Sequence, residues 1–566
     1  MPSAKSIVRR EANQSIVEWD WPAHVHPVLR QVYARRAITS PADLDLVLGG
    51  LVPVGSFDVL TDAVELLLQH RDARIVVVGD FDSDGATSVA LMLLCLRKFG
   101  FADVQFFIPD RFNMGYGLST AAVEHLAQLN PALLVTVDNG VSSVAGVAAA
   151  RELGIDVLIT DHHLPPEQLP AANVLVNPNL PGQEFKGQNL AGVGVAFYLL
   201  AALGRALGDS AGIAEYLDLV ALGTVADLVP LDQQNRILVQ QGLLRIRGGR
   251  CRPGIRALCE LSGVELHRVT ASTLGYQLGP RLNAAGRLDD MSIGVRCLIE
   301  ESDQAALELA RQLDTLNRSR REMETEMRAE ALDLVESLSL DARVDEQSVL
   351  SLMRDNWHEG LVGLIASRVK ERHGLPVFAF APSGDGLKGS GRSVAGFHLR
   401  DALAEVDALQ PGLIKKYGGH AMAAGLSIEA DALPAFAAAI DAVGAKRLSA
   451  DQRLQKLLSD GELAGDLMTI EVAEAIRAAG PWGQSFPEPL FDGVFTIADW
   501  RWLKDLHLKM TLQPVDGGTR VEAIAFNSEF CEPATGSKVR ACYQLGVNEY
   551  FSEPRVQLIV EHLENI

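Results

Sequence analysis

An apolar run that ends in three closely spaced aspartates constrains this chain most strongly. The run IVVVGDFDSDGATS occupies residues 75–88 and places Asp80, Asp82 and Asp84 directly after a predicted strand. Side chains two residues apart on an extended chain point the same way, so these carboxylates converge on one spot. Without a cation they would repel each other, and a bound divalent metal ion, or a pair of them, is the usual way to hold them together. The alternative interpretation is an acidic turn that caps a helix beginning near Gly85.

Two later strand ends carry further side chains that can ligate a metal. LLVTVDNG ends in Asp138, and VLITDHH ends in Asp161, His162 and His163. In an open parallel sheet the carboxyl ends of the strands share one edge, where ligands bind. The set is rich in carboxylates, poor in histidine and free of thiolates, which favours manganese or magnesium over zinc. Asp227 in ALGTVADLVPL stands between apolar residues and is costly to bury without a positive partner.

Predicted strands and helices alternate through the first part of the chain. This alternation predicts a parallel sheet with helices on both faces. From about residue 190 to 262 the pattern is helical, and it includes Asp227. The strands are expected at 75–78, 104–109, 133–138, 157–160 and 173–177, and the helices open at Gly85, Ser119 and Ser142.

The second half of the chain predicts three further parts. A charged segment at 292–340 has apolar residues near heptad spacing, which predicts one long helix between two lobes. A second alternating unit follows at 345–446 and contains the glycine-rich segments GSGRS and YGGH, which we expect to be turns. Beyond about residue 460, five short strands predict a small barrel. The strands are expected near 349–354, 376–381 and 422–428 in the second unit, and near 490–497, 507–514, 519–526, 538–547 and 555–562 in the barrel.

Composition limits the class of protein. A length of 566 residues predicts three or four domains, and an apolar fraction of 48% can fill several cores. No apolar stretch reaches the length of a membrane span, and MPSAKSIVRRE does not have the pattern of a secretory signal. Six cysteines without a CxxC pair fit a reducing cytoplasm and disfavour a structural zinc site. A net charge of −21 does not exclude DNA, because binding depends on local basic patches.

Eight motifs together resemble a known family. GDFDSDG, VDNG, DHH and GTVAD, in this order, resemble the metal-site motifs of the DHH phosphoesterases. GPRLNAAGRLDD, WHEGLVGLIASRV, GSGRS and KYGGHAMAAG are similar to segments of the RecJ single-strand DNA exonucleases. The resemblance implies an α/β fold of two lobes, a DHH parallel-sheet domain and a DHH-associated domain joined by a long helix, plus a C-terminal OB-fold β-barrel. The expected parts are an N-terminal arm (1–55), the DHH catalytic domain (56–265), a connecting helical segment (266–342), the DHH-associated substrate-binding domain (343–446) and the OB-fold nucleic-acid-binding domain (460–566).

The same resemblance implies hydrolysis assisted by two divalent ions, Mn²⁺ or Mg²⁺, which activate a water and relieve charge on the phosphoryl oxygens. Asp138 is expected to bridge the ions, and His163 to orient a ligand or donate to a phosphate. Many relatives have a histidine where Val78 stands, which weakens the ligand assignment for the first ion. The other expected ligands are Asp84, His162 and Asp227 for one ion, and Asp80 and Asp82 for the other.

Glycine-flanked donors predict phosphate contacts. In GSGRS, Ser390 and Arg392 can donate to phosphate oxygens, and YGGH offers His420. By resemblance, Arg111, Ser390 and Arg392 hold the 5′ phosphate of a single DNA strand, with Arg281 nearby. An OB-fold holds a strand by stacking bases on aromatic rings and pairing phosphates with cations. The barrel candidates are Trp500, Trp502, Lys504, Lys509, Phe526 and Tyr550.

The expected activity is that of a 5′-to-3′ exonuclease that releases mononucleotides from single-stranded DNA in repair and recombination. A single-strand-binding protein and a helicase are the expected protein partners, and no membrane is involved. One alternative is a DHH hydrolase of short oligonucleotides or cyclic dinucleotides, against which the terminal barrel counts. Another is an inactive DNA-binding scaffold, which has no need to retain mutually repelling carboxylates.

Overall fold

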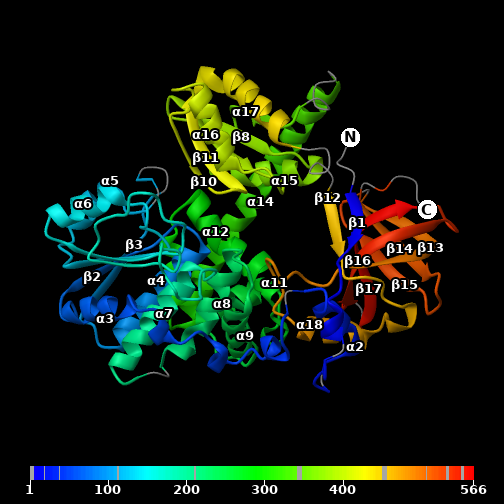
Figure 1. Cartoon of the computed structure of the whole chain (residues 1–566), viewed down its shortest axis with the longest axis horizontal. Helices are drawn as coiled ribbons and strands as arrows, with labels where there is room; N and C mark the ends of the chain where they lie inside the picture. The colour runs from blue at the N-terminus through cyan, green and yellow to red at the C-terminus, as the bar shows by residue number, and fades with distance from the viewer. Residues whose placement is uncertain are drawn as a thin grey trace.

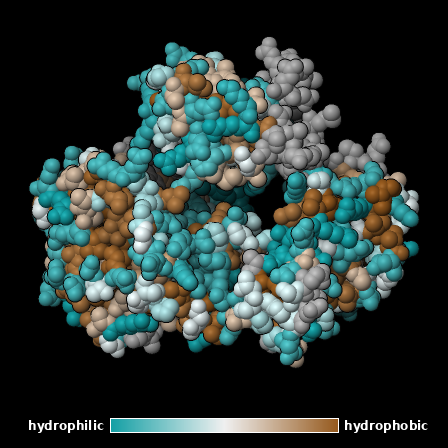
Figure 2. Space-filling model, in the orientation of Figure 1, coloured by the Kyte–Doolittle hydropathy of each residue, from teal (hydrophilic) through white to brown (hydrophobic). Residues whose placement is uncertain are grey.

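The chain folds into a large α/β body, a smaller lobe above it and a barrel to one side (Figure 1). Figure 2 shows a hollow between these three bodies. Within the described residues, every helix is too short or too polar to cross a lipid bilayer. The structure, a computed structural model, describes residues 5–566 except 18, 24, 37, 111–113, 116, 210–211, 341–346, 449–454, 505, 529, 531–533 and 550–552.

The large body contains a five-stranded sheet in the order β3-β2-β4-β5-β6, and all its strands are parallel. Ile75 and Val77 pack into one core with α4 and α7, while Val76 and Val78 pack with α5 and α6 on the other face. The predicted sheet with helices on both faces is therefore confirmed. Its elements are β2 (Arg74–Val78), β3 (Asp103–Phe107), β4 (Leu133–Val137), β5 (Asp156–Thr160), β6 (Val174–Val176), α3 (Leu60–Gln69), α4 (Ser83–Lys98), α5 (Thr120–Ala127), α6 (Val144–Glu152) and α7 (Gly192–Ala206).

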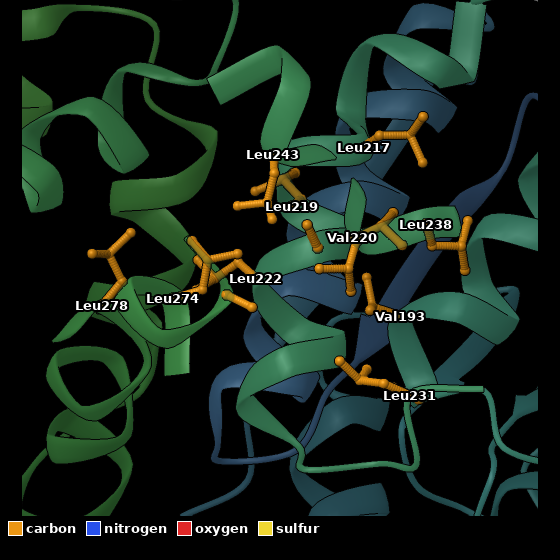
Figure 3. Close-up of a cluster of buried hydrophobic side chains, with 14 of the residues drawn as sticks. Val193, Leu217, Leu219, Val220, Leu222, Leu231, Leu238, Leu243, Leu274 and Leu278 are labelled. Atoms are coloured by element: carbon orange, nitrogen blue, oxygen red, sulfur yellow. The ribbon is translucent and has the colours of Figure 1, made fainter. Parts of the chain in front are cut away.

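A buried helix carries the isolated aspartate of the sequence. Apolar side chains cover most sides of α8 (Leu217–Ala226), so it packs in the interior between α4, α9 and η6. Figure 3 shows four apolar side chains of α8 among side chains of α9 and η6. Those of α8 are Leu217, Leu219, Val220 and Leu222, and their neighbours are Leu238, Leu243, Leu274 and Leu278. Because α8 is enclosed, its C-terminal end places Asp227 at a fixed position. The helices that follow it in the chain are α9 (Gln233–Arg247), α10 (Pro253–Leu261), α11 (Ala271–Thr273), the π-helical turn η6 (Leu274–Leu278) and α12 (Gly279–Leu288).

The predicted long helix between the lobes is confirmed as α14 (Asp303–Leu340), but it begins later in the predicted segment 292–340 than its first residue. A separate short helix, α13 (Ser292–Ile299), precedes it. The backbone of Glu300 is extended, and its Oε1 accepts hydrogen bonds from the amides of Glu301 and Ser302. This local bonding competes with the helix and breaks it.

The upper lobe holds a mixed five-stranded sheet in the order β10-β11-β9-β8-β7. The prediction that GSGRS and YGGH are turns is wrong, because most of each segment lies in a strand, β9 or β10. A Cβ on Gly389 or Gly391 would lie 2.4 or 2.5 Å from a phenylalanine ring of β8, so glycine lets the rings pack. The elements are β7 (Leu350–Met353), β8 (Val377–Ser383), β9 (Gly386–Arg392), β10 (Lys416–Gly419), β11 (Ala423–Glu429), α15 (Val362–His373), α16 (Leu399–Leu409) and α17 (Leu433–Arg447).

The C-terminal part forms a closed five-stranded barrel, as predicted. The N-terminal arm contacts it, because β1 (Lys5–Arg9) pairs in parallel with β12 (Gln455–Ser459). The strands of the barrel are β13 (Phe491–Leu503), β14 (His507–Pro514), β15 (Val521–Ala525), β16 (Lys538–Asn548) and β17 (Arg555–Asn565). The remaining helices are α1 (Gln14–Val17), α2 (Pro27–Tyr33) and α18 (Ile470–Ala478), with short turns η1 (Pro41–Leu44), η2 (Leu48–Gly50), η3 (Val54–Ser56), η4 (Gly212–Tyr216), η5 (Leu266–Arg268), η7 (Ala430–Ala432) and η9 (Gly465–Leu467).

Candidate active site

The ends of β2, β4 and β5 bring the predicted acidic and histidine side chains to one edge of the sheet. These strands are neighbours, and α8 adds Asp227 from the side. The ligand atoms of Asp84, His162 and Asp227 lie within 4.8 Å of one another. Two further groups meet the same criterion, and both contain Asp138: one with Asp80 and Asp82, the other with His162 and His163.

Backbone amides hold the aspartates of the first loop. Asp82 caps α4, since its Oδ1 accepts hydrogen bonds from the amides of Asp84 (2.9 Å) and Gly85 (3.0 Å). The carboxylate of Asp84 accepts from the amides of Gly192 (2.6 Å) and Val193 (2.9 Å), in the first turn of α7. Burial and the charge of Asp82 nevertheless raise the pKa of Asp84 to about 7. The amides position these acids but do not offset their charge.

His162 lies between two carboxylates without bonding to them. Its Nε2 is 3.1 Å from Oδ1 of Asp138 and 3.5 Å from Oδ2 of Asp227. Neither His162 Nε2 nor Asp227 Oδ2 has a hydrogen-bond partner among the described residues, although both atoms are buried. Burial, with the charge of His163, lowers the pKa of His162 to about 4, so its ring is neutral near pH 7. Buried oxygens and a neutral imidazole nitrogen that converge in this way fit a divalent cation.

Asp138 has a strained backbone at the centre of the cluster. Its φ of 62° lies in the left-handed region, which is uncommon for a residue other than glycine. A Cβ on Gly192 would lie 2.6 Å from Cβ of Asp138, so α7 begins directly against it. Burial first, and then the charge of Asp84, raise the pKa of Asp138 well above its ordinary value. Strain of this kind concentrates at functional sites.

Asp161 orients the histidine pair. It is buried, and its carboxylate accepts hydrogen bonds from the amides of Val141, His162 and His163. Its Oδ1 also lies 2.8 Å from Nδ1 of His163. Although burial lowers it, the pKa of His163 is raised to about 9 by Asp161, so the ring is charged at neutral pH. The sequence analysis named Asp161 at the end of a strand but gave it no role among the expected ligands, although its position in the DHH motif could have indicated this one.

The upper lobe reaches the same site. The ring of His420, just after β10, stacks on that of His163 with centroids 6.3 Å apart. The side chains of Ser390 and Arg392 lie at the first turn of α15, where a Cβ on Gly363 would be 3.0 and 2.8 Å from them. Nη1 of Arg392 donates to Ser390 Oγ, and in the described part of the chain no carboxylate lies within 4.0 Å of this guanidinium. A largely buried arginine at a helix N-terminus forms a site for an anion.

Comparison with known proteins agrees with this geometry. Models of the DHH family N-terminal domain, the DHHA1 domain and the RecJ OB domain match residues 74–224, 346–446 and 459–562. The single-stranded-DNA-specific exonuclease RecJ of Dickeya dadantii (strain 3937) is 48% identical to this chain over 573 residues, covering 99% of each. The chain belongs to the RecJ family.

Solved structures of RecJ extend the likeness to the whole fold. RecJ of Thermus thermophilus in complex with Mn²⁺ matches with a TM-score of 0.81 at 29% identity, over 100% of this chain and 79% of that one. Its complex with Mg²⁺ matches with a TM-score of 0.75 at 28% identity, over 100% and 78%. These two structures hold the two ions that the residue types of this chain favour.

Not every predicted RecJ site residue reaches the cluster. Arg281 is buried, and it donates to Asp314 of α14 (2.9 Å) and to the carbonyl of Gln277 (2.6 Å), so its contacts favour a role in holding α12 to α14. Val78 is buried inside β2, and no ligand for an ion comes from this position. Arg111 lies outside the described residues.

The barrel candidates divide by exposure. Phe526 is 55% exposed and packs edge-on against His507, and Trp502 is 37% exposed. Trp500 is partly buried against the core, and Lys509 pairs with Glu522 at 3.0 Å. Lys504 lies in the turn after β13, and Tyr550 lies outside the described residues. Phe526 and Trp502 are thus the rings best placed to meet a base.

Proposed function

We propose that this chain is a metal-dependent exonuclease that removes mononucleotides from the 5′ end of single-stranded DNA. The observation that carries the proposal is the pairing of two sites of opposite charge. One is the buried carboxylate and histidine cluster at the sheet edge, and the other is the largely buried Arg392 in the facing lobe. The first site requires cations and the second requires an anion. A strand with a terminal phosphate can occupy both, with this phosphate at Arg392 and a phosphodiester at the metal cluster.

Two groups of side chains would hold two divalent ions. Asp138 lies in a position to serve both, since it joins Asp80 and Asp82 on one side and His162 on the other. Asp84 and Asp227 would complete the second set. When bound, Mn²⁺ or Mg²⁺ would lower the pKa of an attacking water and neutralise charge on the phosphoryl oxygens.

The protein residues orient the substrate and stabilise charge. His163 is held by Asp161 and carries a proton at neutral pH, so it can donate a hydrogen bond to a phosphoryl oxygen as negative charge builds there. His420 stacks on it from the other lobe, so both lobes contribute to this part of the site. Both lobes must therefore be in place for hydrolysis.

The pocket of Arg392 accounts for the polarity. We propose that a 5′ phosphate pairs with Arg392 and Ser390 at the first turn of α15 and that this contact sets the first phosphodiester of the strand at the metal cluster. Cleavage then occurs after the first nucleotide, and a mononucleotide leaves. Arg111 is proposed to join this pocket.

The barrel is proposed to hold the strand away from the scissile bond. Exposed Phe526 and Trp502 supply surfaces for base stacking, each worth about 1–3 kcal/mol. A hydrolase of dinucleotides has no use for such a domain. We propose functional boundaries at 56–265, 266–342, 343–446 and 460–566 for the catalytic, connecting, substrate-binding and barrel parts, after an arm at 1–55.

We also propose partners and a compartment. A helicase that frees single strands and a single-strand-binding protein that holds them would deliver the substrate. The five cysteines in the described portion are free and buried, which supports a reducing compartment such as the cytoplasm. Co-purification with each protein tests the first point.

A single digestion experiment tests the function. Single-stranded DNA, duplex DNA and a dinucleotide, each labelled at either end, are incubated with the protein with and without manganese. We expect mononucleotides from the 5′ end of the single strand only when manganese is present. Equal digestion of duplex, or digestion from the 3′ end, would contradict the proposal.

A further inference from the structure

An arginine-lined cavity lies beside the candidate active site, and none of the roles proposed above uses it. It has a volume of about 440 Å³ and lies between η6, α12, α14 and α15. The hollow in Figure 2 opens in the region where Figure 1 places α12, α14 and α15. The lining residues that matter most are Tyr276, Arg287, Arg320, Arg321, Arg328 and Arg368.

The charge of this cavity is strongly positive. Five arginines line it together with one carboxylate, Glu324. Glu324 accepts hydrogen bonds from Arg320 (2.8 Å) and Arg368 (3.4 Å), so these two side chains are held in place. Arg321 and Arg328 are exposed and have no carboxylate within 4.0 Å among the residues that the structure describes. They are seven residues apart on α14 and face the same side, which leaves a pair of cations for an anionic ligand.

An exposed aromatic ring lies in the same cavity. Tyr276 is 77% exposed and belongs to the π-helical turn η6. Turns of this kind are rare and occur often at functional sites. A ring beside arginines is the combination that binds single-stranded nucleic acid, because bases stack on the ring while phosphates pair with guanidinium groups.

Hydrogen bonds connect one wall of the cavity to the metal-site loop. Asn283 lines the cavity, and its Oδ1 accepts hydrogen bonds from the amide and hydroxyl of Ser83, both at 2.8 Å. Ser83 stands between the two metal-site aspartates at the start of α4. On the other wall, Arg368 belongs to α15, whose first turn holds the proposed 5′ phosphate pocket. One wall of the cavity therefore contacts the metal-site loop, and the other belongs to the helix that carries the proposed 5′ phosphate pocket.

We infer that this cavity binds the DNA strand on the 3′ side of the cleaved bond, with Tyr276 against a base and Arg321 and Arg328 on phosphates. The inference rests on the proposed function and specifies the path of its substrate. Because these contacts lie beyond the first nucleotide, they act on long strands and not on a dinucleotide. The chain should therefore prefer strands long enough to fill the cavity.

The test compares strand lengths in matched variants. The double variant Arg321→Ala/Arg328→Ala and the single variant Tyr276→Ala are assayed on 5′-phosphorylated oligothymidylates of two, five, ten and twenty nucleotides. Arg311→Ala is the control, because Arg311 is exposed on the same helix and pairs with Glu308 outside the cavity. KM and kcat are measured for every length at several salt concentrations.

We expect the double variant to raise KM for the longest strand at least tenfold while kcat on the dinucleotide stays unchanged. The slope of log KM against log salt should fall by about 1.4, which is roughly 0.7 for each lost phosphate contact. Tyr276→Ala should raise KM at least fivefold, and Tyr276→Phe should restore it because the ring can still stack. Arg311→Ala should match the unmodified chain.

Three outcomes separate the possible failures. If the double variant has the same KM and salt slope as Arg311→Ala at all lengths, the inference is overturned. If the unmodified chain digests no strand, the proposed function fails. The cavity can still be tested by fluorescence anisotropy of labelled oligothymidylates, whose binding should weaken in the double variant. If the double variant loses binding of a polyglutamate peptide but keeps its affinity for DNA, the cavity serves an acidic protein partner and the inference is wrong.

Discussion

Two clusters of buried aspartates in this molecule differ in how their charge is offset. At the junction of the arm and the barrel, Asp492 accepts hydrogen bonds from Arg9 (2.9 Å) and Arg540 (2.8 Å), and Asp460 accepts one from Arg36 (2.7 Å). At the edge of the DHH sheet, the described residues place no arginine or lysine within 4.0 Å of Asp227, and the neighbouring His162 is neutral. The first cluster is complete within the chain, whereas the second requires a cation from outside.

The pKa of Asp492 follows the same division, whereas that of Asp460 does not. Although burial raises it, the pKa of Asp492 is lowered to about 2 by Arg9, Ser459 and Arg540. Burial keeps the pKa of Asp460 above its ordinary value despite Arg36. In the sheet-edge cluster, the pKa of Asp138 and that of Asp227 are raised well above the ordinary value by burial and by neighbouring carboxylates. A buried acid with arginine partners supports the fold, and one surrounded by other acids marks a binding site.

The largest expected effect is on catalysis. Replacing Asp138 by alanine should lower kcat on single-stranded DNA by more than about a thousandfold, because this residue serves both proposed ions. The stability of the metal-free protein should stay unchanged or rise, since a repelling charge is removed. Asp156→Ala is the control, because Asp156 lies at the other end of β5 and pairs with His70. Full activity of Asp138→Ala with manganese would refute the role of Asp138.

A substitution at the junction of the arm and the barrel should lower stability, in contrast to Asp138→Ala. Asp492→Ala should lower the free energy of unfolding by about 3 kcal/mol, because Arg9 and Arg540 would lose their shared partner. Urea unfolding of the metal-free protein, followed by tryptophan fluorescence, measures this change. A loss of stability in Asp138→Ala as large as that in Asp492→Ala would remove the distinction between the two clusters.

A third site carries the opposite charge. Arg392 is a largely buried arginine, and no carboxylate of the described residues pairs with it. Arg392→Ala should reduce kcat/KM on 5′-phosphorylated strands by about tenfold or more, since a charge-assisted hydrogen bond contributes roughly 1.5–3 kcal/mol. Strands with a 5′ hydroxyl should be affected much less. Competition between the two substrates in one reaction gives the ratio directly. An equal loss on both would show that Arg392 does not read the terminal phosphate.

The smallest effect concerns pH. The pKa of Asp492 in the folded state, about 2, is below its ordinary value of 3.8. Its contribution to stability is therefore present above about pH 4 and is lost as the pH falls toward 2. Between pH 5 and pH 3 the loss should be at most about 1 kcal/mol, because Arg9 and Arg540 are partly exposed and water screens the pair. Asp492→Asn should lack this pH-dependent loss of stability. If the stability of Asp492→Asn and that of the unmodified chain change identically with pH, the loss does not come from Asp492.

Local patterns in the sequence were sufficient to predict the sheet edge. The strands before Asp80, Asp138 and His162 are short apolar runs, and the parallel order follows from the alternation with helices. The barrel was equally visible, because its strands are separated by turn residues. Both predictions depend on residues that are close together in the chain.

Contacts between distant segments could not be predicted. The amides that hold Asp84 come from Gly192 and Val193, more than a hundred residues later. Arg281 pairs with Asp314 because α12 packs on α14, which no local pattern indicates. Gly389 and Gly391 were predicted to lie in a turn, but they lie in a strand. Glycine is required there because phenylalanine rings of another strand pack against it, and no local pattern shows this contact. Such errors come from tertiary packing that overrides local preference.

The most direct test is a titration of the metal-free chain with Mn²⁺ by calorimetry, beside Asp138→Ala and Asp492→Ala. We expect the unmodified chain and folded Asp492→Ala to bind two ions. Asp138→Ala should bind at most one, at least tenfold more weakly. Unchanged binding in Asp138→Ala, or no binding to the unmodified chain at millimolar Mn²⁺, would contradict the claim that the buried carboxylates of the sheet edge form a metal centre.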